Sequence, residues 1–501
     1  MRRAARIAFV LSLALLWTLI LFLGLECYHA FRWHAIQRSN PLVLERGDAV
    51  MWTSGEDIEG SPPPRDALPT PPAFADRLTV QSRRLSVFEG LTDLERRMFA
   101  DSYGVRVVVA DASANLRSVY ARGWSTDAPA ELKEIVGAYT DIIVRRNLAQ
   151  AIESGRPEIL ARDAQSVGGE ADSVLIYPLH DGETAAVLVA EPAGPGATTS
   201  ERLVWEAPFF VYKPCVSREG KDFWTNNVGF RDDDVVLPKP PGVFRVVCIG
   251  GSTTEEGPTH ADTYPNLLER RLRESFETES IEVINCGIAG MSVFKEWLRL
   301  PDFLALDPDL LVAYNAVNDL CHGVFPVYLN EATPLRRLVR RSAALNDYLN
   351  AWLVPLEDVT RLTKTTTLAH MAAIANAAQQ SGVGMVLCSF AVPAKTGLSR
   401  AERDYFEYTF MRDWGGRYVT FATYRRALDQ LNREIKKLCD EVGAVYAPVA
   451  ERLSGGSECF DDICHMTNAG IERKAEIVFE SIRDIVADRI GATPRTTEAT
   501  E

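Results

Sequence analysis

The C-terminal half of the chain alternates short apolar runs with longer amphipathic stretches. The apolar runs are rich in β-branched residues, as strands buried on both faces are. They span residues 246–249, 281–284, 309–314, 383–390 and 443–448. Helical periodicity lies between and after them, near residues 263–275, 293–304, 420–440 and 469–489. Strands and helices that alternate in this way form a parallel sheet with helices on both faces. Residues 242–490 are therefore predicted to form an α/β domain.

A smaller domain is predicted at residues 77–192. Its apolar runs predict a helix at residues 131–154 and strands at residues 105–110, 116–121, 158–161, 173–179 and 184–190. This order favours an antiparallel sheet with helices on one side. The order and the stretches AIESGRPEIL and VLIYPLHDGETAAVLVAEP resemble a GAF- or PAS-like sensor domain. The resemblance implies a small α+β fold that either holds a small-molecule pocket or serves as a spacer or dimerising module.

The N-terminus combines basic residues with a long apolar run. Arginines lie within the basic segment 1–6, and residues 7–25 are apolar except for Ser12, Thr18 and Gly24. A membrane-spanning helix needs about 20 residues, and residues 7–26 are predicted to form it. No small-x-small cleavage site follows, so we expect an uncleaved, single-pass transmembrane signal anchor. The basic N-terminus favours the cytoplasmic side, which places the body of the chain in the periplasm or outside the cell. Arg32 and Arg38 on the other flank leave the cytoplasmic orientation as the alternative.

The segments between these parts are irregular. Residues 27–76 are rich in proline and glycine and predict an extended linker between membrane and domain. Residues 193–241 are predicted to connect the two domains, and residues 491–501 to form a disordered tail.

Charge and cysteine usage exclude several classes of function. The 501 residues carry a formal net charge of −14, which argues against nucleic-acid binding because that needs a basic surface. No CxxC pair or HExxH motif is present, so we expect no metal site. Cys248 and Cys388 lie in strand-like runs, where buried thiols are expected. Cys459 and Cys464 either form a disulfide in an oxidising compartment or stay reduced.

The chemistry is expected at the end of the strand at 246–249. This strand runs directly into Gly250, Gly251 and Ser252. Ligands of open α/β sheets bind at the carboxyl ends of the strands, and glycines there let backbone amides approach an anion. Ser252 is therefore either a nucleophile at this edge or the N-cap of the following helix.

Further polar blocks follow other strands of the same sheet. They are residues 285–290 (NCGIAG), 315–319 (NAVND) and 461–470 (DDICHMTNAG). A hydroxyl nucleophile needs a base, the base needs an orienting carboxylate, and the developing oxyanion needs fixed donors. These blocks supply each of those residue types at the edge that carries Ser252. Taken singly, Asn318 and Asp319 also suit a turn, and His465 also suits a solvated loop.

Together, the four blocks resemble the SGNH (GDSL-type) hydrolase family. The resemblance implies that Ser252 is the nucleophile, that His465 is the general base and that Asp462 orients the base. It also implies an oxyanion hole made by the backbone amides of Ser252 and Gly290 and the side-chain amide of Asn318.

Two positions depart from the family pattern. Gly251 stands where an aspartate usually precedes the nucleophile, and Ala316 stands where the third block usually has glycine. Neither change removes a member of the predicted triad. Asp461 is an alternative orienting carboxylate and His322 an alternative pocket residue, and we expect both to be bystanders.

The resemblance implies an SGNH-type three-layer sandwich and a serine esterase that needs no metal or organic cofactor. With the N-terminal signal anchor, we expect a membrane-anchored serine esterase. The expected substrates are carboxylic esters, namely an acylated small molecule, an O-acetylated or otherwise O-acylated glycan, or a lipid ester. One alternative is an O-acyltransferase with the same triad. The other is a non-enzymatic membrane-tethered sensor or scaffold.

Two stretches of the α/β domain have no role in this scheme. Residues 335–341 (LRRLVRR) are basic and amphipathic and lie within a helical insertion at 330–380. They either lie on anionic lipid, cover the site as a lid, or form a crossover helix with a solvated basic face. The loop at 395–420 is rich in aromatic residues, which suit either sugar stacking or an apolar wall.

Overall fold

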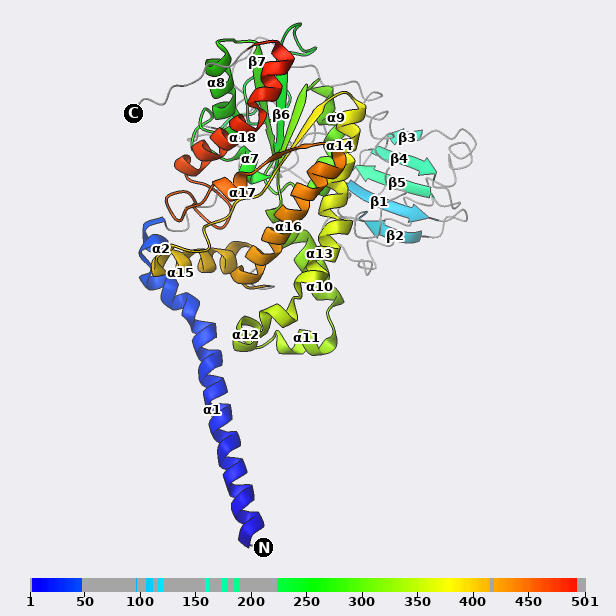
Figure 1. The fold of residues 1–501 in the computed structure, drawn as a ribbon. Coiled ribbons are helices and arrows are strands. Elements are labelled where there is room, and N and C mark those ends of the chain that lie inside the picture. Colours follow the sequence, from blue (N-terminus) through cyan, green and yellow to red (C-terminus); the bar gives the residue numbers. More distant parts are fainter. Residues whose placement is uncertain are drawn as a thin grey trace, which may run out of the picture. The chain divides into compact units, whose positions relative to one another are not determined.

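Five parallel strands organise the C-terminal half of the chain (Figure 1). The structure is a computed structural model that describes residues 2–46, 96, 105–110, 116–120, 158–161, 173–178, 184–189, 223–414 and 419–492. The chain divides into two compact units. The α/β unit comprises residues 1–52, 241–294 and 308–501, and the second unit comprises residues 53–240 and 295–307.

The sheet of the α/β unit has the strand order β10-β9-β8-β6-β7, and every pairing is parallel. Its strands are β6 (Phe244–Gly250), β7 (Ile281–Gly287), β8 (Leu310–Tyr314), β9 (Gly384–Cys388) and β10 (Val445–Ala447). Every residue of β6 and β8 is buried, because this part of the sheet is covered on both faces. The chain passes from β6 to β7 on one side and then to β8 on the other. The carboxyl end of β6 is therefore a topological switch point, where open α/β sheets bind ligands.

Helices cover both faces of this sheet. On one face, α8 (Tyr264–Phe276) and α18 (Asn468–Ile490) pack against each other. On the other face, α14 (Thr367–Gln380) and α16 (Phe421–Val442) pack against β9. The predicted three-layer α/β arrangement is confirmed, and the predicted strands and helices of this domain all occur within a few residues of their expected bounds.

The predicted helical insertion lies between β8 and β9. It begins with the π-helix η4 (Asp319–Val324) and continues through α10 (Phe325–Glu331), α11 (Pro334–Val339), α12 (Ala343–Leu353), α13 (Leu356–Thr365) and α14. The remaining elements that follow β6 are α7 (Ser252–Glu255), α9 (Val293–Ala305), α15 (Arg400–Thr409), η5 (Phe410–Trp414) and α17 (Val449–Arg452).

The second unit contains an antiparallel sheet, as the sequence predicts. The strand order is β2-β1-β5-β4-β3, and every pairing is antiparallel. The strands are β1 (Val105–Ala110), β2 (Leu116–Tyr120), β3 (Glu158–Ala161), β4 (Ser173–Pro178) and β5 (Thr184–Val189). The helix predicted at 131–154 lies outside the described residues. The GAF- or PAS-like character of this unit stays a prediction.

The N-terminal helix extends well beyond its apolar run. Helix α1 spans Arg2–Ser39 and α2 spans Pro41–Arg46, so residues 27–39 and 41–46 of the predicted linker are helical. The only proline in that stretch is Pro41, at the first position of α2, where a helix tolerates proline. By length and composition, α1 is the one helix among the described residues that could cross a membrane.

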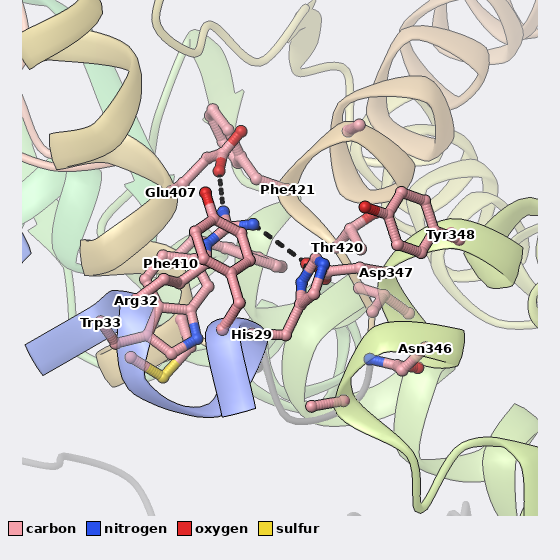
Figure 2. Close-up of a pocket in the computed structure, with 15 residues that line it drawn as sticks. His29, Arg32, Trp33, Asn346, Asp347, Tyr348, Glu407, Phe410, Thr420 and Phe421 are labelled. Carbon is pink, nitrogen blue, oxygen red and sulfur yellow. Dashed lines mark hydrogen bonds and ion pairs between the residues drawn. The ribbon is translucent and has the colours of Figure 1, made fainter. Parts of the chain in front are cut away.

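Specific polar contacts hold the end of α1 on the α/β unit. Arg32 Nη1 lies 3.0 Å from Asp347 Oδ2 on α12, and Arg32 Nη2 also pairs with Glu407 on α15. Figure 2 shows Arg32 between these two carboxylates, with His29 beside Asp347. Further along, Asn40 donates a 2.8 Å hydrogen bond to the carbonyl of Ala401. These tertiary contacts explain why the chain stays helical where its sequence alone suggested an extended linker.

Candidate active site

Ser252 lies at the switch point of the sheet. It follows β6 and is the first residue of the short helix α7, and only 7% of its surface is exposed. Gly251, not Ser252, occupies the N-cap position of this helix. The alternative interpretation of Ser252 as a helix cap is therefore wrong, and its hydroxyl is available for another partner.

The structure brings Ser252, His465 and Asp462 together. His465 Nε2 lies 2.8 Å from Ser252 Oγ, and His465 Nδ1 lies 2.7 Å from Asp462 Oδ2. The second carboxylate oxygen of Asp462 accepts hydrogen bonds of 2.7 Å from the backbone N–H groups of Cys464 and His465. With Nδ1–H donated to Asp462, Nε2 is left to accept the proton of the serine hydroxyl. This is the arrangement that activates a serine nucleophile.

The electrostatics of this pair keep Asp462 ionised. Burial alone would raise the pKa of Asp462, but the charge of His465 and the hydrogen bonds from His465 and Cys464 lower it to about 2. Burial alone would lower the pKa of His465, but the charge and hydrogen bond of Asp462 raise it to about 9. Asp462 thus makes the imidazole a stronger base than an isolated histidine.

The three predicted oxyanion donors come from the ends of β6, β7 and β8. Gly290 has φ 74°, a left-handed conformation that favours glycine, in the turn after β7. Asn318 follows β8, and its Nδ2 donates a 2.8 Å hydrogen bond to the carbonyl of Met291, the residue after Gly290. This bond uses one of the two amide hydrogens of Asn318 and fixes the side chain beside Gly290. The other hydrogen can donate to an oxyanion.

The structure gives a steric reason for the glycine at position 251. A Cβ atom built on Gly251 would lie 2.8 Å from Asn318 Nδ2 and 3.2 Å from the carbonyl oxygen of Met291. An aspartate at this position would therefore push against the amide that is predicted to hold the oxyanion. Ala316, the second departure from the family pattern, is fully buried and leaves the bond between Asn318 and Met291 intact.

A buried ion pair behind the site escaped the sequence analysis. Lys474 Nζ on α18 lies 2.8 Å from Glu256 Oε1 and donates a 2.6 Å hydrogen bond to the carbonyl of Thr253. Glu256 Oε2 accepts a 2.9 Å hydrogen bond from the backbone N–H of Met466, the residue after His465. These contacts join the segment that carries Ser252 to the segment that carries His465. Nothing in the local sequence distinguishes these two residues from surface charges.

Helix α2 supports the loop that leads to the triad. Arg46 donates hydrogen bonds to the carbonyls of Ser457, at 2.6 Å, and Phe460, at 2.8 Å. Tyr405 on α15 donates from its hydroxyl to the carbonyl of Asp461. The backbone just before Asp462 is therefore held from outside the α/β sheet. Arg46 lies in the segment predicted to be a linker, and no local pattern in the sequence indicates this role.

The remaining candidates are not part of the hydrogen-bond chain from Ser252 to Asp462. The Asp461 side chain is 40% exposed and pairs with Arg46 at 3.2 Å, while His322 is exposed on η4. Cys459 and Cys464 are both free thiols, and the Cys464 sulfur lies 3.8 Å from His465 Nδ1. Asp462, Cys464 and His465 have side chains of types that can bind metal. In this structure, however, the Asp462 carboxylate and the His465 imidazole are hydrogen-bonded to each other.

The aromatic residues of the 395–420 loop that the structure describes are mostly internal. Tyr405, Phe406, Tyr408 and Phe410 are all buried. They favour the apolar-wall alternative over a sugar-stacking surface.

Two cavities in the described part of the chain also lie apart from the triad. One, of about 520 Å³, lies between α1, α12 and α15 and is drawn in Figure 2. The other, of about 410 Å³, lies between the loop after β9 and α16. Neither is lined by Ser252, Asp462 or His465.

The pKa of His465 predicts an alkaline pH profile. His465 accepts a proton only when neutral, and its pKa is raised, so kcat/KM for p-nitrophenyl acetate should rise with pH along a limb that lies above pH 7. Asp462→Asn removes the charge that raises this pKa, so the limb should move to lower pH while the plateau falls by about 10⁴-fold. Steady-state kinetics between about pH 5 and about pH 10 measure both the position of the limb and the height of the plateau. A limb at the same pH in both proteins would contradict the assignment.

The crowding at Gly251 predicts a second effect. Gly251→Ala should displace the Asn318 amide and so lower kcat/KM. Removal of one oxyanion donor typically lowers the rate by about 10²- to 10³-fold, and the loss should approach that size. The same substitution in an Asn318→Ala background should then cost little more, because the amide is already absent. Steady-state kinetics of the two single variants and the double variant test this. Fully additive losses would show that Gly251 acts through another group.

Comparisons with known proteins identify the α/β region. Residues 248–473, which include Ser252, Asp462 and His465, match the GDSL-like lipase/acylhydrolase family. A search of curated proteins gave no match.

Several solved structures are similar to the chain at low identity. Axe2, an acetylxylan esterase from Geobacillus stearothermophilus, is 15% identical, with 48% of this chain and 94% of that chain covered and a TM-score of 0.31. A GDSL-like lipase from Bacteroides thetaiotaomicron is 16% identical, with 50% and 93% covered and a TM-score of 0.29. TesA is 16% identical, with 48% and 99% covered and a TM-score of 0.32. By the family match, residues 248–473 form a domain of the GDSL-like lipase/acylhydrolase family, and the chain is an enzyme that hydrolyses ester bonds.

Proposed function

We propose that this protein is a membrane-anchored serine esterase that cleaves a carboxylic ester through an acyl-enzyme on Ser252. The observation that carries the proposal is the continuous hydrogen-bond chain from Ser252 through His465 to Asp462, with distances of 2.8 and 2.7 Å. The family match at residues 248–473 supports the reaction type.

In the acylation step, Ser252 Oγ attacks the ester carbonyl while His465 Nε2 takes the hydroxyl proton. Asp462 holds the imidazole in the tautomer that leaves Nε2 free to accept it, and stabilises the imidazolium that forms. The oxyanion of the tetrahedral intermediate accepts hydrogen bonds from the amides of Ser252 and Gly290 and from Asn318. The intermediate then collapses, and His465 returns the proton to the departing alkoxide, which leaves as an alcohol.

In the deacylation step, water replaces the alcohol. His465 takes a proton from the water as its oxygen attacks the acyl carbonyl, and the same donors hold the second oxyanion. Collapse of this intermediate releases the carboxylic acid and returns the proton to Ser252 Oγ. Every step uses side chains and backbone amides of this chain.

The substrate class we propose is an ester of a short acyl group, with O-acetylated or otherwise O-acylated glycan ahead of lipid ester. A long acyl chain needs an apolar cavity next to the nucleophile. The two cavities described above are not lined by triad residues, so neither is proposed as the acyl site.

Helix α1 supports the membrane anchor in this proposal. Its apolar side chains are exposed along the span, as they would be in contact with lipid, and one stretch has a mean hydropathy of 1.9. The basic residues before the span favour a cytoplasmic N-terminus, with the enzyme on the opposite side of the membrane.

Turnover tests the enzymatic part of the proposal. The full chain in detergent should hydrolyse p-nitrophenyl acetate faster than octanoate, and Ser252→Ala should lower kcat/KM by about 10⁴-fold or more because the nucleophile is lost. An unchanged melting temperature shows that the variant is folded. Equal turnover by both proteins would rule out Ser252 as the nucleophile. A transfer product formed with an acceptor sugar, in place of free acetate, would favour the O-acyltransferase.

Reporter fusions test the orientation. Alkaline phosphatase folds to an active enzyme only outside the cytoplasm, because it needs disulfides. A fusion after Trp33 should therefore be active, and a fusion to a reporter that works only in the cytoplasm should be silent. The reverse pattern would place the enzyme in the cytoplasm.

A further inference from the structure

Exposed apolar side chains of the α/β unit gather on two adjacent helices. Outside α1 and α2, the large apolar residues that are exposed in the described part of this unit all lie on α11 and α12. They are Leu335, Leu338, Tyr348, Leu349 and Trp352, with exposed fractions between 40% and 65%. A patch of this kind marks an interaction surface. Leu335 and Leu338 are three residues apart on α11, and Tyr348 and Trp352 are four apart on α12, so each pair lies on one helix face.

Contacts with α1 fix the level of this patch along the proposed membrane span. Glu26, the last residue of that span, accepts hydrogen bonds from the backbone N–H groups of Ala343, at 2.9 Å, and Ala344, at 3.3 Å. Helix α12 therefore begins at the point on α1 where the apolar run ends. Figure 1 shows α12 beside α1, with α11 next to α12, at the edge of the α/β unit from which the long N-terminal part of α1 projects. A bilayer crossed by residues 7–26 would have its headgroup layer at this level.

The attachment of α1 is firm enough to hold this geometry. One turn after Glu26, His29 Nδ1 lies 2.6 Å from Asp347 Oδ2, and Arg32 bridges Asp347 and Glu407 (Figure 2). Helices α1 and α12 thus contact each other at successive turns of α1. We take α12 to keep its place beside α1 when the span is in a membrane.

The polar residues of the patch match an anionic lipid surface. The sequence from 334 to 353 contains four arginines and one acidic residue, in a chain whose net charge is −14. Arg337 and Arg341 are exposed. Arg336 lies 5.5 Å from the ring centroid of Trp352, which joins α11 to α12. Tryptophan, tyrosine and arginine next to exposed leucines are typical of helices that lie in the headgroup region.

We propose that α11 and α12 lie on the membrane surface as a second attachment, with their leucines and Trp352 among the lipid headgroups and Arg337 and Arg341 against anionic lipid. This inference rests on the proposed membrane span of α1. Two attachments fix the rotation of the α/β unit about α1, which a single helix cannot do. A lid over the active site and a solvated crossover helix are the alternatives, and neither places Leu338 in contact with lipid.

Photocrosslinking tests this surface. The full chain, in nanodiscs of phosphatidylcholine and phosphatidylglycerol, would carry the photoreactive residue p-benzoylphenylalanine in place of Leu338. Two control variants carry the same photoreactive residue elsewhere. Leu15, inside the span and 72% exposed, is the positive control, and Arg483 on α18, whose side chain is 42% exposed, is the negative control. After irradiation, mass spectrometry should find lipid adducts at positions 15 and 338 and none at 483.

The outcomes separate this inference from the proposal on which it rests. A lipid adduct at position 15 without one at 338 would leave the anchor in place and overturn the surface. No adduct at position 15 would refute the membrane span, and the surface with it. Reversing the charges with Arg337→Glu and Arg341→Glu should lower the adduct yield at 338 several-fold in anionic nanodiscs and leave it unchanged in neutral ones. An equal yield in anionic nanodiscs would contradict the electrostatic part of the inference.

Discussion

A buried ion pair holds the two halves of the active site together. Glu256 and Lys474 are 218 residues apart in sequence and 2.8 Å apart in the structure, and both are almost fully buried. Burial raises the pKa of Glu256, and the charge of Lys474 opposes this rise. Through Thr253 and Met466, the pair fixes α7, which begins with Ser252, against the loop that carries His465. Loss of one partner leaves an uncompensated buried charge, which typically costs about 3–5 kcal/mol. The 2.8 Å contact between Ser252 and His465, the proposed nucleophile and base, joins the same two segments.

Much of the fold and the candidate site could be predicted because both depend on local sequence patterns. Apolar runs of strand length between amphipathic stretches specify a parallel sheet, and a parallel sheet places the carboxyl ends of its strands at one edge. Ser252, Gly290 and Asn318 follow the adjacent strands β6, β7 and β8, so they lie near one another once the strands are located. His465 lies in the loop after β10, the edge strand, and the strand positions alone do not place it beside Ser252. The Asp-x-x-His spacing placed Asp462 within reach of the imidazole.

The parts that could not be predicted depend on contacts between distant segments. The ion pair of Lys474, the steric demand at Gly251 and the role of Arg46 each involve partners that lie far away in the sequence. Residues 27–39 and 41–46 are helical and contact the α/β unit through residues such as Arg32 and Asn40, and no local pattern records those contacts. The same contacts connect the proposed anchor to the catalytic loop, since Arg46 holds the backbone just before Asp462. The proposed membrane anchor and the support of the backbone before Asp462 thus belong to one N-terminal segment.

The central claim is that His465 and Asp462 activate Ser252, and a covalent probe tests it most directly. A fluorophosphonate reacts with an activated serine and leaves a stable adduct that peptide mass spectrometry locates. The account predicts one adduct per chain, on the peptide that contains Ser252, and no adduct in His465→Gln, which lacks the base. A folded wild-type protein that takes no adduct, or takes it on another serine, would contradict the account.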